Sequence, residues 1–187
     1  MTSECAQTKE SSACGCRFSP PDKTAWVLWS TLALFGAVAD LWTKQAVFDW
    51  LGPVGSGKIY RVIPGFFHLV PCLNSGAAFS IFQGQRFYLS AVSILALLVI
   101  GFLFTLGKIQ GRLLQTAIGL ITAGILGNLY DRLFNHGLVR DFLDFHIRSY
   151  HWPTFNLADT LLCIGVGLIL LAGFTSEACQ KQNPPQK

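Results

Sequence analysis

The stretch FNLADTLLCIGVGLILLAGF, from Phe155 to Phe174, is long and apolar enough to cross a lipid bilayer as a helix, which takes about 20 residues. Its fifth residue is Asp159. A carboxylate at membrane depth is energetically costly and usually marks a functional site. The segment therefore predicts a membrane protein and also indicates where its chemistry takes place.

The composition of the whole chain agrees with this prediction. Of the 187 residues, 51% are hydrophobic and 13% are charged, and the mean hydropathy is +0.45. These values exclude an ordinary soluble domain of this length and favour one compact membrane domain. The net charge of +4 is not gathered into a basic run, so we do not expect nucleic acid as a partner.

Three further apolar runs are close to the length that spans a bilayer. The four runs are Thr24–Leu41, Phe87–Leu106, Leu113–Tyr130 and Phe155–Phe174. Because they do not alternate as barrel strands do, they are expected to span as helices. The sequence thus predicts an all-α membrane protein with four transmembrane helices.

The membrane domain is expected to cover residues 24–175, between two polar ends. Residues 1–23 lack the apolar core of a secretory signal peptide, so we expect a disordered tail followed by an uncleaved first helix. Residues 176–187 are expected to form a C-terminal tail. The six cysteines show neither CxxC nor zinc-ligand spacing, which favours free thiols.

Polar residues gather at one end of the expected bundle. Four antiparallel spans bring the ends of the first and third helices beside the starts of the second and fourth. The polar residues near this end are Asp40, Lys44, Asn74, Asn128, Asp131, Arg132, Asn156 and Asp159. Scattered structural residues would not sort in this way, so we expect a single site just below one membrane surface.

The short loop Gly107–Arg112 indicates which surface this is. Lysine and arginine divide evenly between the two sides, but this loop carries Lys108 and Arg112 and no acid. Six of the ten acidic residues lie on the site side. Short basic loops stay inside, so we expect cytoplasmic termini and a site facing outward.

The two connections on the site side are longer. Residues 45–86 contain IYRVIPGFFHLVPCL, a β-leaning stretch broken by two prolines, which favours a small extramembrane sheet. Residues 133–154 mix apolar and charged residues, as is typical of a segment lying at the membrane interface.

Asp141 and Asp159 are the candidate catalytic groups. Two carboxylates held close in a partly dry site share a proton, so one can act as base and the other as acid against an amide carbonyl. Alternatively, Asp159 caps its helix or pairs with Arg132. The pattern alone leaves both interpretations open.

The neighbouring polar residues also have two interpretations. Asn74, Asn128 and Asn156 can orient a carboxylate or hold a substrate backbone, or they can bond one helix to another. Arg132 can neutralise the carboxylates or extend its head to the membrane surface.

Two other groups remain. Asp40 and Lys44 lie one helical turn apart and can pair beside the site. The four histidines form no HExxH motif, and a metal site at His146 and Asp144 is an alternative that the pattern does not favour. We therefore expect neither a metal nor an organic cofactor.

Five short motifs follow one another along the chain. They are D-x-x-x-K at Asp40–Lys44, N-x-G-x-A-F at Asn74–Phe79, G-N-x-x-D-R at Gly127–Arg132, D-F at Asp141, and F-N-x-A-D at Phe155–Asp159. In this order and at these helix ends, they resemble the bacterial lipoprotein signal peptidase family, signal peptidase II. The resemblance covers roughly residues 24–175.

This resemblance implies a membrane aspartyl endopeptidase of the bacterial inner membrane, with its site facing the periplasm. Its substrates would be prolipoproteins whose lipobox cysteine carries diacylglycerol, cut just before that cysteine. The family's catalytic pair falls on Asp141 and Asp159. Its substrate-binding or supporting positions fall on Asp40, Lys44, Asn74, Gly76, Asn128, Arg132, Asn156 and Ala158. The family's small sheet and interfacial helix would correspond to residues 45–86 and 133–154.

Two features depart from the family pattern. The connection from Asp131 to Asp141 is a residue longer than usual, and Arg140 replaces a usual apolar residue. Asp131 and Asp144 therefore compete for the role assigned to Asp141, which is favoured by its spacing to Asp159.

Two other functions remain open: a small proton- or cation-coupled transporter and a non-catalytic assembly factor. The expected partners are lipid-modified prolipoproteins and membrane lipids, and we expect a monomer.

Overall fold

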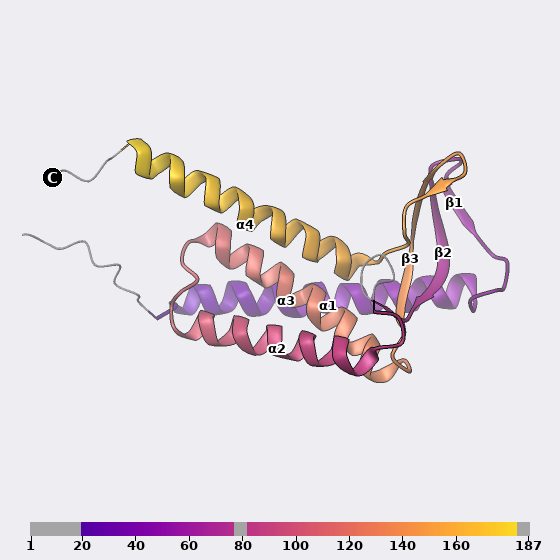
Figure 1. Ribbon diagram of the computed structural model, residues 1–187, viewed down its shortest axis with the longest axis horizontal. Coiled ribbons are helices and arrows are strands. Elements are labelled where there is room, and N and C mark those ends of the chain that lie inside the picture. The colour runs from indigo at the N-terminus through magenta and orange to yellow at the C-terminus, as the bar shows by residue number, and fades with distance from the viewer. Residues whose placement is uncertain (1–19, 77–81, 183–187) are drawn as a thin grey trace, which may run out of the picture.

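The computed structural model describes residues 20–76 and 82–182, with side chains described as far as residue 174. Four helices are long and apolar enough to cross a membrane: α1 (Lys23–Leu51), α2 (Arg86–Thr105), α3 (Arg112–Phe134) and α4 (Leu157–Gln182). They run lengthwise through the molecule, and a small sheet lies at one end (Figure 1). The four predicted helices are thereby confirmed, whereas most of the predicted N-terminal tail lies outside the described residues.

Helix α1 is longer than the apolar run that predicted it. It begins after Asp22, whose carboxylate accepts a hydrogen bond from the backbone N–H of Ala25 at 2.7 Å, a typical N-cap. It continues ten residues past Leu41 and ends at Leu51, before Gly52 with φ of 83°. Its last turns lie beside the sheet (Figure 1), so α1 contributes both to the bundle and to the site end.

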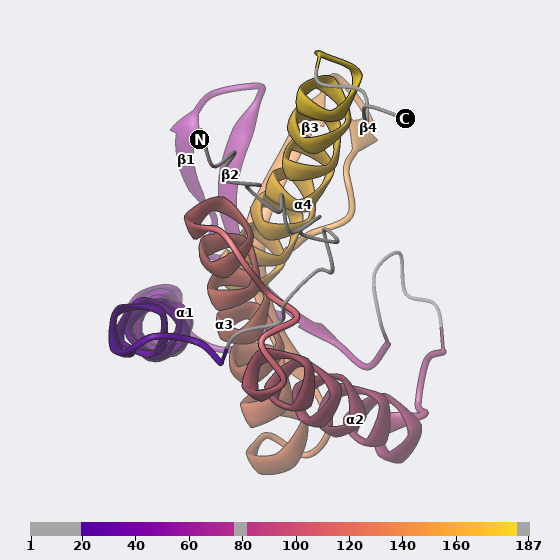
Figure 2. The same ribbon diagram turned by 90° about the vertical axis from the view of Figure 1, so that its left-hand side faces the viewer.

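Helix α3 occupies the centre of the bundle. Figure 2 shows α1, α2 and α4 arranged around it, and it contacts all three. In the most apolar 18-residue segment of α3, 50% of the residues are buried, compared with 11–22% in the corresponding segments of the other three spans. The outer helices expose apolar side chains, which suits contact with lipid tails.

Small residues allow α3 and α4 to pack closely. A Cβ atom on Gly124 would lie 2.5 Å from the carbonyl oxygen of Ala158 and 2.6 Å from Cγ of Leu162. Such distances are too short for packed atoms, so only glycine fits here. Small residues commonly permit this close approach between membrane helices.

We expect Gly124→Ala to lower the free energy of unfolding by roughly 1–3 kcal/mol, because its methyl group overpacks the interface. Reversible unfolding in mixed micelles would measure this difference. The matched control is Gly167→Ala on α4, where a Cβ would meet no atom of the described residues within 4 Å. Equal destabilisation by the two substitutions would contradict the packing argument.

The sheet is antiparallel, with the strands in sequence order: β1 (Tyr60–Ile63), β2 (Phe67–Asn74), β3 (Val139–Ile147) and β4 (Tyr150–His151). The first two strands confirm the sheet predicted within residues 45–86. Pro71 lies in β2 where the register shifts between Leu69 and Cys72. The shift is expected at this position because proline has no N–H to donate to a neighbouring strand.

The prediction of an interfacial helix within residues 133–154 is wrong. Helix α3 ends at Phe134, and His136 and Gly137 follow with φ of 52° and 86°, a left-handed conformation that terminates helices. The chain then forms β3 and β4. Strand β3 lies between β2 and β4 and has buried residues on both faces. It therefore lacks the alternation that identifies a surface strand in the sequence.

Candidate active site

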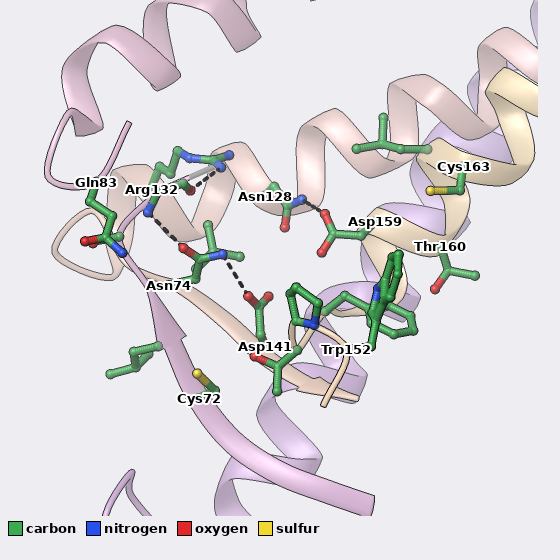
Figure 3. Close-up of a pocket in the computed structure, with 18 residues that line it drawn as sticks. Cys72, Asn74, Gln83, Asn128, Arg132, Asp141, Trp152, Asp159, Thr160 and Cys163 are labelled. Carbon is green, nitrogen blue, oxygen red and sulfur yellow. Dashed lines mark hydrogen bonds between the residues drawn. The ribbon is translucent and has the colours of Figure 1, made fainter. Parts of the chain in front are cut away.

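A cavity of about 640 Å³ lies where the sheet meets the bundle. Residues of β2, β3, α3 and the start of α4 line it, among them Asn74, Asp141, Asn128 and Asp159. Figure 3 shows the carboxylates of Asp141 and Asp159 turned toward the same space, from strand and helix respectively. The fold therefore brings the two predicted catalytic residues into one site.

Asp141 lies on β3 and is only 1% exposed. Asn156 donates an amide hydrogen bond to its Oδ1 at 2.6 Å, and Asn74 donates one to its Oδ2 at 3.1 Å. Burial, followed by the nearby charge of Asp159, raises the pKa of Asp141, and the two amide donors partly oppose this rise, so that the pKa is about 7. A carboxyl group with this pKa can hold a proton at neutral pH.

Asp159 lies in the first turn of α4. Its Oδ2 accepts the backbone N–H of Asn156 at 3.2 Å, and its own backbone N–H donates to Oδ1 of Asn156 at 3.0 Å. This reciprocal pair is a capping box. Asn128 of α3 donates to the other carboxylate oxygen at 2.8 Å. Asp159 therefore caps its helix, as one interpretation of the sequence proposed, and it also faces the cavity.

Asn156 links the two carboxylates through Asn128. Its amide nitrogen donates to Asp141 and also to Oδ1 of Asn128 at 3.1 Å. The same Oδ1 accepts a hydrogen bond from Lys44 Nζ at 3.0 Å. Because an ammonium group can only donate, Lys44 keeps the Asn128 oxygen toward itself, and the Asn128 amide nitrogen then faces Asp159.

Behind these amides lies a buried cluster of charges. Lys44 Nζ lies 2.7 Å from Asp40 Oδ2 and 3.3 Å from Asp131 Oδ2, and all three side chains are fully buried. The other oxygen of Asp40 accepts the backbone N–H of Ala158 at 2.8 Å. The cluster thus joins α1, α3 and α4, and it supports the residues that touch the cavity.

Arg132 and Gly76 form another part of the cavity wall. Arg132 Nη2 donates to the Gly76 carbonyl at 3.3 Å, and the Gly76 N–H donates to Asn74 Oδ1 at 2.9 Å. Ala158 is fully buried, and its described role is the hydrogen bond to Asp40. The last residues of the N-x-G-x-A-F motif, 77–79, lie outside the described residues.

A family model described as Signal peptidase (SPase) II matches residues 32–175 of this chain. The chain belongs to the signal peptidase II family. It is 37% identical to the lipoprotein signal peptidase of Yersinia enterocolitica over 166 residues, which is 86% of this chain and 94% of the relative. It is also 37% identical to the lipoprotein signal peptidase of Rhodopirellula baltica, over 80% of this chain and 72% of that one.

Solved structures agree with this assignment. The fold matches a bacterial membrane enzyme determined by the in meso method at 2.3 Å resolution, with a TM-score of 0.72 and 32% identity, over 85% of this chain and 92% of that chain. A second bacterial membrane enzyme, determined at 1.9 Å, matches with a TM-score of 0.67 and 34% identity, over 77% and 90% of the two chains. This signal peptidase II homologue is thus a multi-pass membrane protease, and the comparisons give no support to the transporter alternative.

The structure also explains how this signal peptidase departs from the family pattern. Arg140 Nη2 lies 2.7 Å from Asp131 Oδ1, and the Arg140 backbone N–H donates to Asp131 Oδ2 at 3.0 Å. Asp131 is thereby fully engaged with Arg140 and Lys44. Asp144 borders a different cavity. Among the described residues, Asp141 and Asp159 are the two carboxylates that line the larger cavity.

Sequence reasoning did not anticipate several residues that line the signal peptidase cavity, including Cys72, Trp152 and Cys163. Cys163 is one helical turn beyond Asp159, so the spacing alone could have placed it on the same face. Both Cys72 and Cys163 are free thiols, as predicted, while the side chains of the other four cysteines lie outside the described residues.

Proposed function

We propose that this protein removes signal peptides from diacylglyceryl-modified prolipoproteins by aspartic catalysis, cutting just before the lipidated cysteine. The observation that carries the proposal is the convergence of Asp141 and Asp159 on one cavity at the sheet end of the bundle. The names of the relatives, lipoprotein signal peptidases, support this class of substrate.

Within this proposal, Asp141 is the acid and Asp159 is the base. Asp141 is buried, and its raised pKa, about 7, favours the protonated form. Asp159 is only partly buried, in contrast to Asp141, and it accepts hydrogen bonds from Asn128 and from the Asn156 backbone. The environments of the two carboxylates thus differ in the way that separates an acid from a base.

The reaction begins when Asp159 takes a proton from a water molecule. The water oxygen forms a bond to the scissile carbonyl carbon, while Asp141 gives its proton to the carbonyl oxygen. The tetrahedral intermediate then returns a hydroxyl proton to Asp141, and Asp159 delivers its proton to the leaving amine. The C–N bond breaks, and both carboxyl groups regain their starting states. The net reaction consumes one water and needs neither a metal nor an organic cofactor.

The other residues hold the catalytic pair in position. Asn74 and Asn156 orient Asp141, and Asn128 orients Asp159. Lys44 fixes the orientation of Asn128. The preorganised hydrogen bonds lower the reorganisation required during the reaction. In this proposal Gly76 and Arg132 contact the substrate, because both line the cavity.

The proposed setting is the bacterial inner membrane, with the active site facing the periplasm and both termini in the cytoplasm. Lys108 and Arg112 support this orientation because they lie in or next to the short loop at the opposite end from the sheet. The substrate's acyl chains would remain in the bilayer, while its lipidated cysteine would lie at the depth of Asp141 and Asp159. A single chain supplies both carboxylates, so we propose that the enzyme works as a monomer.

Cleavage of a purified precursor in proteoliposomes tests the function. A diacylglyceryl-modified prolipoprotein should yield a product whose first residue is the lipidated cysteine, as read by mass spectrometry. The matched control is the same precursor without diacylglycerol, which should be cut far more slowly. Cleavage at another bond, or equal rates for both precursors, would reject the proposed specificity.

The pKa of Asp141 predicts a pH dependence. The protonated acid predominates below a pH of about 7 and is lost as pH rises through that value, so kcat/KM should fall there. Asn74→Ala removes a donor that favours the ionised form, and the fall should therefore move to higher pH. Cys163→Ala, which also alters the cavity wall, should leave the pH of this fall in kcat/KM unchanged. A shift of the Asn74→Ala profile to lower pH would contradict the assignment.

A further inference from the structure

Three histidines and an aspartate gather on the sheet, outside the proposed catalytic pair. His68 of β2 is directly opposite Asp144 of β3, and His146 of β3 is opposite His151 of β4. Asp144 and His146 are two residues apart, so alternation along the strand gives them the same face. Asp141 is three residues before Asp144 and therefore points to the opposite face. The fold thus separates this His–Asp cluster from the catalytic cavity.

The side chains of the His–Asp cluster converge on the carboxylate of Asp144. His151 Nδ1 lies 2.9 Å from Oδ1, while His146 Nδ1 and His68 Nδ1 lie 3.6 Å and 3.9 Å from Oδ2. The ring centroids of His68 and His146 are 4.2 Å apart, and those of His146 and His151 are 4.7 Å apart. Three imidazoles therefore surround one acidic group.

Hydrogen bonding leaves part of the cluster unsatisfied. His146 is 8% exposed, and among the described residues its Nδ1 has no hydrogen-bond partner. His68 Nε2 is likewise buried without such a partner among the described residues. A buried polar group without a hydrogen-bond partner destabilises the folded protein. Protonating the rings would place positive charges side by side, so protons alone do not resolve the arrangement.

We propose that the His–Asp cluster binds a divalent transition-metal ion of the zinc class. The ligands are His68, Asp144 Oδ2 and His146, from each of which one donor atom lies within 4.8 Å of the others. Imidazole nitrogen and carboxylate oxygen are ordinary zinc ligands. In a tetrahedral zinc site with bonds of about 2.0–2.1 Å, neighbouring ligand atoms are roughly 3.3 Å apart. The two observed separations from Oδ2 exceed this by less than about 1 Å, so small side-chain movements close the site.

In this site His151 contacts the ligand Asp144 and does not bind the ion itself. Its Nδ1 lies 2.9 Å from Oδ1 and 3.2 Å from Oδ2 of Asp144, so an N–H directed at the nearer Oδ1 leaves Oδ2 for the ion. Such a carboxylate–histidine contact orients a metal ligand. Arg61 faces His68 in the β1–β2 register but is exposed, which leaves its charge in solvent.

The site would join β2 and β3 next to the β4 hairpin. A second cavity, of about 440 Å³, borders the cluster at His68, Asp144 and His151. Trp152, Pro153 and Thr154 line this cavity and also the catalytic one. A bound ion would therefore fix the segment that separates the two cavities.

Metal titration of the full chain in detergent, without a polyhistidine tag and after chelator treatment, tests the proposal. Cobalt(II) should produce the visible absorption of a tetrahedral complex with a single equivalent bound, and zinc(II) should displace it. His146→Ala and Asp144→Asn should weaken zinc binding by at least about 100-fold, and His151→Ala by about 10–100-fold as expected for an orienting partner.

The matched control is His136→Asn, which changes the one histidine outside the cluster. Asparagine tolerates the left-handed backbone of this position, where φ is 52°, so its zinc affinity should equal that of the parent. The parent protein also tests the proposal without any variant, since absence of the tetrahedral cobalt spectrum overturns it. Equal loss of zinc binding by His136→Asn and His146→Ala would overturn it too.

Discussion

Asp159→Asn should abolish cleavage of a lipidated precursor while the protein still folds and inserts. The amide oxygen of asparagine can still accept the hydrogen bond from Asn128 or from the Asn156 backbone, so the helix cap is largely kept. The amide cannot take a proton from water, and loss of a general base commonly costs up to about 10⁴-fold in rate. We therefore expect single-turnover cleavage in proteoliposomes to fall by roughly 10³–10⁴-fold.

Two further variants make this result specific. Asp141→Asn should give a loss of similar size, and the double variant should be little worse than either single one, because the carboxylates act as a unit. Asp49→Asn is the matched control, since Asp49 lies near the end of α1 and accepts a hydrogen bond from Gln45 at an exposed position. Cleavage that survives at near-parental rates in either Asp159→Asn or Asp141→Asn would reject the assigned pair.

Lys44→Met should strongly reduce both stability and cleavage. Methionine fills a similar volume, but Asp40 loses its ion-pair partner and Asp131 keeps only Arg140. Removing one member of a buried ion pair typically costs about 3–5 kcal/mol, and we expect a decrease of that size in the free energy of unfolding. Cleavage should also fall because Asn128 is no longer held with its amide nitrogen toward Asp159.

A second substitution separates these two effects. Adding Asp40→Asn to Lys44→Met removes the unpaired charge, so part of the stability should return. Cleavage should remain low, since nothing in the double variant restores the hydrogen bond to Asn128. Lys58→Met, an exposed lysine before β1, is the control and should match the parent. Full recovery of cleavage in the double variant would show that Lys44 acts only through charge balance.

The sequence was sufficient for the features that repeat over many residues or carry unusual chemistry. Apolar runs of bilayer length predicted the four helices because lipid permits few alternatives for a spanning segment. The polar residues at one end of those runs predicted the site, since polar side chains at membrane depth are costly and usually have a function. Asp159 stood out for this reason, and the structure places it on the cavity as part of a helix cap.

Features that depend on pairing between distant segments could not be predicted from the sequence. The mixture of apolar and charged residues in β3 indicates an interfacial segment, whereas the structure shows a strand with buried residues on both faces, which has no clear alternation in its sequence. In the sequence, Arg140 is only a departure from the family pattern, whereas in the structure it pairs with Asp131. The convergence of His68 with His146 depends on the register of β2 and β3, which no local pattern determines.

The two carboxylates proposed to be catalytic are carried by different kinds of element, Asp141 by a strand of the terminal sheet and Asp159 by a membrane helix. Their separation thus depends on how far α4 rises toward the sheet. A spanning helix can tilt when its apolar length differs from the thickness of the bilayer, so bilayer thickness becomes a variable of the proposed reaction. An enzyme built in this way couples peptide hydrolysis to the mechanics of the surrounding lipid.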